Sequence, residues 1–252
     1  MAPTSMATSM ATSMANAANW WDAVTAPQGG WRTGYGETLD GSLNLQAWVD
    51  EIPSGDKAIA HEPYILTAPS ASQRPTPATS GWASSAAAST ALPGTAAEIA
   101  GALRPDTEWT VYAQAYLDAF NTWNPFVNGN GGANARVCLR HYQAGNLGIS
   151  LWDGTAEHKN IPISDALATW YVFAWKCDGA GNVYTYLDGT PLNSAAATKN
   201  PAGMTVLEFF RNSEWTALNS VEGRISTVLC CLAAHSDSEV AANTAIIEGL
   251  LP

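Results

Sequence analysis

The chain has 252 residues, of which 46% are hydrophobic and 13% charged, and it contains 11 Trp, 8 Tyr and 5 Phe. This content of hydrophobic and aromatic side chains predicts one folded domain with a sizeable core and excludes a disordered chain. There are 22 acidic and 11 basic residues, so the net charge is −11. That charge excludes the basic surface that nucleic acid or an anionic membrane requires, and it leaves glycans, proteins and cations as partners.

Residues 1–19 form a low-complexity segment with two copies of the unit Met-Ala-Thr-Ser. The segment lacks a hydrophobic period, so we expect an extended N-terminal arm that becomes ordered on a neighbouring subunit of a homo-oligomer or symmetric assembly. Met6, Met10 and Met14 are the expected anchoring residues, together with Trp20 and Trp21 where the arm meets the folded domain of residues 20–252. Because the segment does not resemble a secretory signal and no later run spans a bilayer, we expect synthesis in the cytoplasm and no membrane partner.

Four cysteines are present, and two of them, Cys230 and Cys231, are adjacent. Cys138 and Cys177 lie in strand-like runs, where they act as small apolar residues. We therefore expect four free thiols rather than a disulfide framework.

The first strand is expected from Leu39 to Trp48, where apolar and polar residues alternate after an Asp-Gly turn. Residues 68–107 are rich in Ala, Ser, Thr and Pro, and the run Arg74-Pro75-Thr76-Pro77 disfavours a central strand. We expect this segment to be a surface excursion with one helical turn near Ala96 to Leu103.

From Trp109 onward the sequence alternates regularly, which predicts a series of short strands. An Asn- and Gly-rich run, 128–134, predicts a loop, and a capping box beginning at Ser236 predicts a helix with Val240, Ile247 and Leu251 on its buried stripe. This spacing is typical of a β-sandwich. The expected strands are Trp109–Leu117, Arg136–Tyr142, Leu147–Trp152, Trp170–Lys176, Asn182–Leu187, Val206–Phe210 and Arg224–Leu232.

Two segments carry a resemblance to a known family. Residues 169–189 contain a Trp-initiated strand, a Gly-containing turn and a second strand ending in Tyr186-Leu187-Asp188-Gly189, and residues 221–226 precede the capped helix. Both resemble laminin-G-like and pentraxin-like domains over about the C-terminal 150 residues. The resemblance implies an all-β, concanavalin-like jelly-roll sandwich with a short C-terminal helix.

No catalytic motif stands out in the sequence. Glycosidases on this sandwich carry two carboxylates on one strand, whereas Asp50 and Glu51 are adjacent and a turn is expected between Glu208 and Glu214. The four histidines lie far apart and no phosphate-binding loop is found. We therefore expect a protein that is not an enzyme and needs no cofactor, with calcium as the one candidate ion.

The resemblance implies a calcium ion at a rim of the sandwich, with Asp153, Asp188 and Asn128 as its candidate ligands. The alternative is that each Asp of an Asp-Gly pair only forms a turn. For glycan binding, the candidates are Trp123, Trp152 and Trp215, which lie in or beside expected loops.

Three functions are compatible with these observations. The first is a non-catalytic virion protein, a bacteriophage capsid decoration or head-surface protein that is anchored by its arm to other virion proteins. The second is a tail-associated adhesin that binds host glycans, and the third is a glycan-active hydrolase. The first two predict that the protein is located in the virion.

Overall fold

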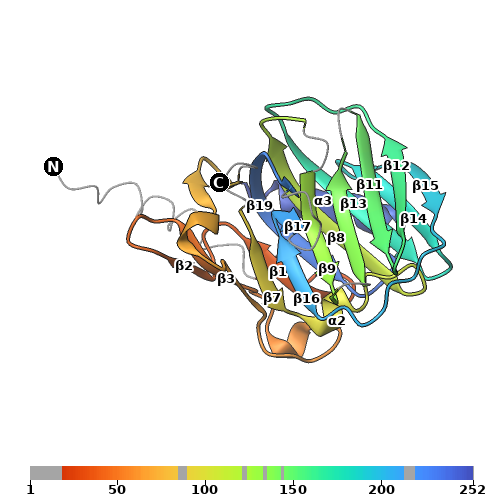
Figure 1. Cartoon of the computed structure of the whole chain (residues 1–252), viewed down its shortest axis with the longest axis horizontal. Coiled ribbons are helices and arrows are strands. Elements are labelled where there is room, and N and C mark those ends of the chain that lie inside the picture. Colours follow the sequence, from red (N-terminus) through yellow and green to blue (C-terminus); the bar gives the residue numbers. More distant parts are fainter. Residues whose placement is uncertain are drawn as a thin grey trace.

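The computed structural model describes residues 19–84, 90–120, 124–132, 135–142, 145–212 and 219–251, the side chains of 211–212 and 219–220 excepted. Two large antiparallel sheets form the body of the molecule (Figure 1). Apolar side chains from both sheets meet in one core cluster, which includes Trp31, Trp109, Phe126 and Trp175. The predicted all-β sandwich with a short C-terminal helix is confirmed.

One sheet has eight strands in the order β15-β14-β13-β8-β19-β6-β5, with β1 pairing to β19. Its central strands β8 and β19 alternate residues of the core with residues of the opposite face. The strands are β1 (Pro27–Arg32), β5 (Thr76–Ala78), β6 (Gly81–Ser84), β8 (Glu108–Leu117), β13 (Trp170–Asp178), β14 (Asn182–Leu187), β15 (Thr190–Ala196) and β19 (Gly223–Cys231).

The other large sheet has six strands in the order β12-β11-β10-β9-β16-β7. Its edge strand β12 contacts β15 of the eight-stranded sheet, so these two edges lie on the same side of the sandwich (Figure 1). The strands are β7 (Leu92–Thr95), β9 (Asn124–Asn130), β10 (Arg136–His141), β11 (Asn146–Trp152), β12 (Ala156–Pro162) and β16 (Val206–Phe209).

Two small sheets complete the fold. The strands β2 (Glu37–Leu39), β3 (Leu45–Val49) and β4 (Ile65–Thr67) form one, and β17 (Arg211–Asn212) pairs with β18 (Asn219–Ser220) in the other. The strand expected between Leu39 and Trp48 is found in part: β3 follows the Asp-Gly turn, but it begins only at Leu45, and Leu39 belongs to β2. The turn over residues 40–44 is held by the Asp40 carboxylate, which accepts hydrogen bonds from the backbone N–H groups of Ser42 and Asn44.

The segment 68–107 is not confined to the surface as expected. It supplies β5 and β6 to the eight-stranded sheet and β7 to the six-stranded sheet. Pro77 is compatible with strand β5 because this strand lies at a sheet edge. The segment also holds the 3₁₀ turn Ala71–Gln73 and the helix α2 (Ala97–Ala100), which confirms the expected helical turn; a second 3₁₀ turn, Ser54–Asp56, precedes the segment.

The hairpin predicted between Trp170 and Leu187 is confirmed as β13 and β14, which pair antiparallel. Trp170 is half-buried, however, while Trp175 is fully buried and donates its indole N–H to the carbonyl of Gly148 in the facing sheet at 3.0 Å. Trp175, rather than Trp170, is the core tryptophan of this hairpin.

The helix α3 (Asp237–Glu248) begins with the predicted capping box, in which Ser236 and Glu239 bond to each other's backbone N–H groups. Val240 and Ile247 are buried as predicted, whereas Leu251 is only half-buried, beyond the end of the helix. The helix covers the outer face of the eight-stranded sheet through a second core cluster that includes Tyr112 and Tyr186.

Trp20 and Trp21 belong to this second cluster. Their indole N–H groups donate to Glu51 at 3.4 Å and to Asp56 at 3.3 Å. Both are buried against this domain, while the other expected anchors, Met6, Met10 and Met14, lie outside the described residues. All four cysteines are buried free thiols.

Candidate glycan-binding face and rim pocket

One row of side chains crosses the outer face of the six-stranded sheet. Strand register places Glu208 opposite Asn128, Asn128 opposite Cys138, Cys138 opposite Ser150, and Ser150 opposite His158. The neighbouring residues Leu207, Val127, Leu139 and Ile149 belong to the core. Because successive side chains alternate between faces, the five residues of the row point away from the core.

Hydrogen bonds fix the polar groups of this face in place. The guanidinium group of Arg140 donates to the hydroxyl of Ser150 at 2.6 Å and to the side-chain oxygen of Asn160 at 2.8 Å. At the other end, the side-chain amide of Asn130 donates to the Glu208 carboxylate at 3.1 Å. Arg140, Ser150 and Glu208 are fully buried, so these polar groups are preorganised rather than free to reorient in water.

The surroundings of the face lower the pKa values of two of its basic side chains, Arg140 and His158. Desolvation lowers the pKa of Arg140 to about 10. Desolvation, and then the charge of Arg140, lower the pKa of His158 below its usual value. The lowered pKa favours the neutral imidazole at pH 7, and its Nδ1 atom lies 2.9 Å from the Ser150 hydroxyl oxygen.

Trp152 lies at the end of β11 in the next row, opposite Arg136 on β10 and Ala156 on β12. The Arg136 guanidinium carbon lies 5.9 Å from the centre of its ring. Trp152 and Arg136 are half-buried, and Ala156, His158 and Asn160 are exposed. This side of the face therefore presents an aromatic ring beside hydrogen-bonding groups. We call this surface the polar face. It comprises Arg136, Trp152, His158 and Asn160, together with the buried polar residues Arg140, Ser150 and Glu208.

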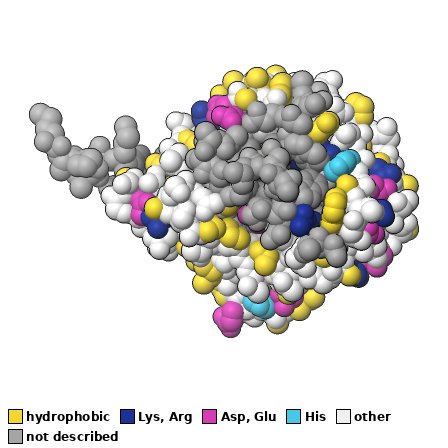
Figure 2. Space-filling view, in the orientation of Figure 1, with side chains coloured by type: hydrophobic (Ala, Val, Ile, Leu, Met, Phe, Trp, Pro, Cys, Tyr) yellow, Lys and Arg dark blue, Asp and Glu magenta, His cyan; other side chains and the backbone are white. Residues whose placement is uncertain are grey.

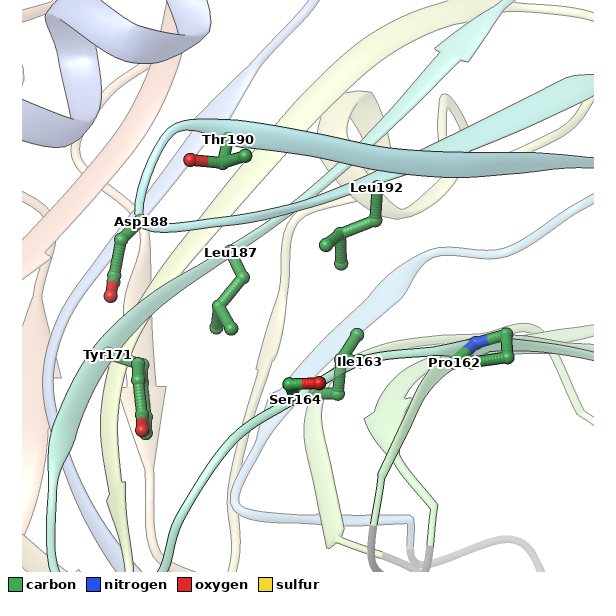
Figure 3. Close-up of a pocket in the computed structure, with 8 residues that line it drawn as sticks. All are labelled: Pro162, Ile163, Ser164, Tyr171, Leu187, Asp188, Thr190 and Leu192. Carbon is green, nitrogen blue, oxygen red and sulfur yellow. The ribbon is translucent and has the colours of Figure 1, made fainter.

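A pocket of about 500 Å³ lies at the rim where the β14–β15 turn meets the chain between β12 and β13 (Figure 3). Asp188 and Tyr171 stand at one end of it, and Leu187 and Leu192 face Ile163 and Ser164 across its middle. Thr190 and Pro162 complete the lining. We call this the rim pocket.

The structure does not bring the three candidate calcium ligands together. Asn128 lies within β9 rather than in the expected loop, and it is buried in the polar row. Asp153 follows β11 and pairs with Lys199 at 3.2 Å, beyond the end of β15. Asp188 lies in the turn at the opposite end of β15. Among the described residues, no cluster of three or more His, Cys, Asp or Glu side chains is arranged to hold a metal ion.

Of the three candidate tryptophans, Trp152 lies on the polar face, and Trp123 and Trp215 fall outside the described residues. Sequence reasoning missed Arg140, Ser150, His158 and Glu208 as site residues. Alternation within β10, β11, β12 and β16 would have placed each of them on an outward face. The register that joins them across the sheet has no local signal in the sequence.

The described part of the polar face holds one carboxylate, that of Glu208. Glycoside hydrolysis ordinarily requires two carboxyl groups about 5–10 Å apart. The described part of the chain therefore provides no such pair on this face, and Glu214 lies outside it. On the described surface visible in Figure 2, acidic and basic side chains lie singly or in small mixed groups. No helix among the described residues is long and apolar enough to span a membrane.

No protein-family model and no curated protein matches the sequence. Among solved structures, domain 4 of AbnA, a GH43 extracellular arabinanase from Geobacillus stearothermophilus in complex with arabinotriose, is similar over 86% of this chain and 98% of that domain, with 10% identity and a TM-score of 0.56. The CBM40 of a Ruminococcus gnavus sialidase, bound to sialyllactose, covers 55% of this chain and 83% of its own (16% identity, TM-score 0.48). A SAP-like pentraxin from Limulus polyphemus covers 54% and 68% (14% identity, TM-score 0.43). The arabinanase domain, similar over most of both chains, supports the assignment of this chain to the jelly-roll, concanavalin-like sandwich fold.

Proposed function

We propose that this chain is a non-catalytic glycan-binding module and that the polar face of its six-stranded sheet is the binding surface. The observation that carries the proposal is the position of Trp152. Its half-buried ring lies beside Arg136 and one row away from the bonded groups of Ser150, His158 and Arg140. An aromatic ring stacks on the apolar face of a sugar, and the exposed side chains of His158 and Asn160 can bond its hydroxyls.

Two further observations support this proposal. The similar arabinanase domain was solved with arabinotriose, so a domain of this fold can hold an oligosaccharide. The described part of the polar face offers one carboxylate, already bonded to Asn130, which favours binding over hydrolysis.

The test compares the two tryptophans that are half-buried among the described residues, Trp152 and Trp170. The wild-type protein, Trp152→Ala and Trp170→Ala are applied to a glycan array that includes arabino-oligosaccharides. We expect Trp152→Ala to weaken binding of the recognised glycan by about tenfold or more, because loss of a stacked ring costs roughly 1–3 kcal/mol. Trp170→Ala, on the other sheet, should bind as the wild type does once its folding has been checked by circular dichroism.

Equal binding by Trp152→Ala and wild-type protein would contradict the assignment of the polar face. Release of reducing ends from the bound glycan would contradict the non-catalytic part of the proposal and favour the glycan-active hydrolase.

We also propose that the module is displayed on a virion, as a capsid decoration or head-surface protein, with a tail adhesin as the alternative. This part rests on the low-complexity repeat of residues 1–19. A glycan-binding face fits either location, since both present the domain to a host surface. A decoration protein should co-purify with heads at a fixed copy number, and an adhesin should co-purify with tails.

A further inference from the structure

The carboxylate of Asp188 is held rigidly at one end of the rim pocket. Asp188 and Gly189 have φ angles of 47° and 72°, which places both in the left-handed region of a tight hairpin turn. The backbone N–H of Asp188 donates to the carbonyl of Val172 at 3.0 Å, and the N–H of Val172 donates to Oδ1 of Asp188 at 2.8 Å. Two bonds to the same residue of β13 therefore fix the direction of the carboxylate.

The second carboxylate oxygen of Asp188 has no hydrogen bond or ion pair within the described part of the chain. None of the residues described as lining the rim pocket is Lys, Arg or His. Asp188 is exposed at the surface, and partial desolvation raises its pKa, as expected for a carboxylate without a neighbouring cation. The turn does not explain this charge, because Asn adopts the same backbone conformation and offers the same acceptor to Val172.

The remaining walls of the rim pocket are complementary to a sugar. Tyr171 presents an aromatic ring, and Ser164 and Thr190 present hydroxyl groups, around the apolar side chains of Leu187 and Leu192 (Figure 3). The Tyr171 hydroxyl accepts the backbone N–H of Ala166 at 3.1 Å, which leaves its own proton for a ligand.

We propose that the rim pocket binds a sugar residue that carries a free amine, with its ammonium group against the open oxygen of Asp188. The pyranose ring packs on Tyr171, where the ammonium also gains from the aromatic face, and the sugar hydroxyls bond to Ser164 and Thr190. A lysine side chain carries the same ammonium group, but on an alkyl chain without hydroxyl groups. It would therefore leave the hydroxyls of Ser164 and Thr190 without partners.

This site is separate from the polar face. The rim pocket lies at the β14–β15 turn, and Trp152 is at the end of β11, near the Asp153–Lys199 pair at the opposite end of β15. The proposed function can therefore fail while this inference holds, and the reverse is also true. A Trp152→Ala protein should retain binding at the rim pocket.

The experiment follows backbone amide resonances by NMR while glucosamine, N-acetylglucosamine or butylamine is added, with the glucosamine trimer as a longer ligand. We expect glucosamine and its trimer to shift the amides of Val172, Asp188 and Gly189. Asp188→Asn keeps the turn and the bond from Val172 and removes only the charge, so it should weaken this binding by about tenfold or more. Asp22→Asn, the same charge change at an exposed position, should leave it unchanged.

Three results would overturn the inference. Equal affinity for N-acetylglucosamine would show that the amine is not recognised, and equal affinity for butylamine would show that the sugar is not recognised. Shifts of the same amides on addition of calcium chloride, with none on addition of glucosamine, would show that Asp188 serves a metal ion instead.

Discussion

At the scale of single residues, the polar face depends on the Ser150 hydroxyl, which joins Arg140 to His158. Arg140 only donates, so Ser150 accepts from Arg140 and has its proton available for the Nδ1 atom of His158. Protonation of His158 would remove this acceptor and place a second cation beside Arg140. The arrangement therefore requires a neutral His158.

This arrangement predicts a pH dependence. The pKa of His158 in the folded protein lies below 6.5 because of desolvation and the Arg140 charge, so the unfolded chain binds the proton more readily. Its contribution to stability is complete above pH 6.5 and is lost as the pH falls through the lower folded pKa. His235, whose pKa is also lowered, acts in the same direction.

A histidine NMR titration should give His158 a pKa below 6.5, and the denaturation midpoint of His158→Gln should fall less between pH 7 and pH 5 than that of the wild type. A normal or raised pKa would contradict the neutral bridge.

At the scale of elements, the edge strands β12 and β15 were not predicted from the sequence. Seven other strands from Trp109 onward could be predicted because their side chains alternate between core and surface: β8, β10, β11, β13, β14, β16 and β19. Strand β1 could not, because all six of its residues are buried and no alternation marks it. Strand β9 was expected in part to be a loop because of its Asn and Gly residues. It forms a strand because it pairs with β10 on one side and β16 on the other. In β5 to β7, too, pairing with distant strands overrides a composition that favours turns.

Only part of the candidate site could be predicted from the sequence. Trp152 was found because it lies beside an expected turn, and Asp188 because it belongs to an Asp-Gly pair. Glu208 and Asn128 meet only through the register of β16 and β9, which lie 80 residues apart in the sequence. The calcium prediction grouped residues by type, and the topology separates Asp153 from Asp188 along the length of β15.

The capping box of α3 gives a prediction at this scale. Ser236 accepts the backbone N–H of Glu239, and the Glu239 carboxylate accepts the backbone N–H of Ser236 at 2.7 Å. Ser236→Ala removes one of these bonds and should lower the free energy of unfolding by about 0.5–2 kcal/mol. Chemical denaturation measures this change. Ser194→Ala, at an exposed position of β15, is the control, and an equal loss in both variants would show that the cap does not act as described.

At the scale of the whole molecule, the described core begins at Trp20, and the indoles of Trp20 and Trp21 anchor this end to Glu51 and Asp56. Deleting residues 1–18 leaves both anchors in place, so the truncated protein should unfold at nearly the same temperature as the full chain. If the arm serves for anchoring, the truncated protein should fail to enter virions. Full incorporation without the arm would contradict the virion part of the proposal.

The central claim is that the polar face of the six-stranded sheet binds glycans. The most direct measurement is an NMR map of the wild-type protein with the oligosaccharide that the array identifies. The account predicts that the Trp152 indole N–H, the Arg136 side chain and the His158 ring shift together and saturate at one ligand concentration. Shifts that leave these three groups unmoved and gather on another surface would contradict it.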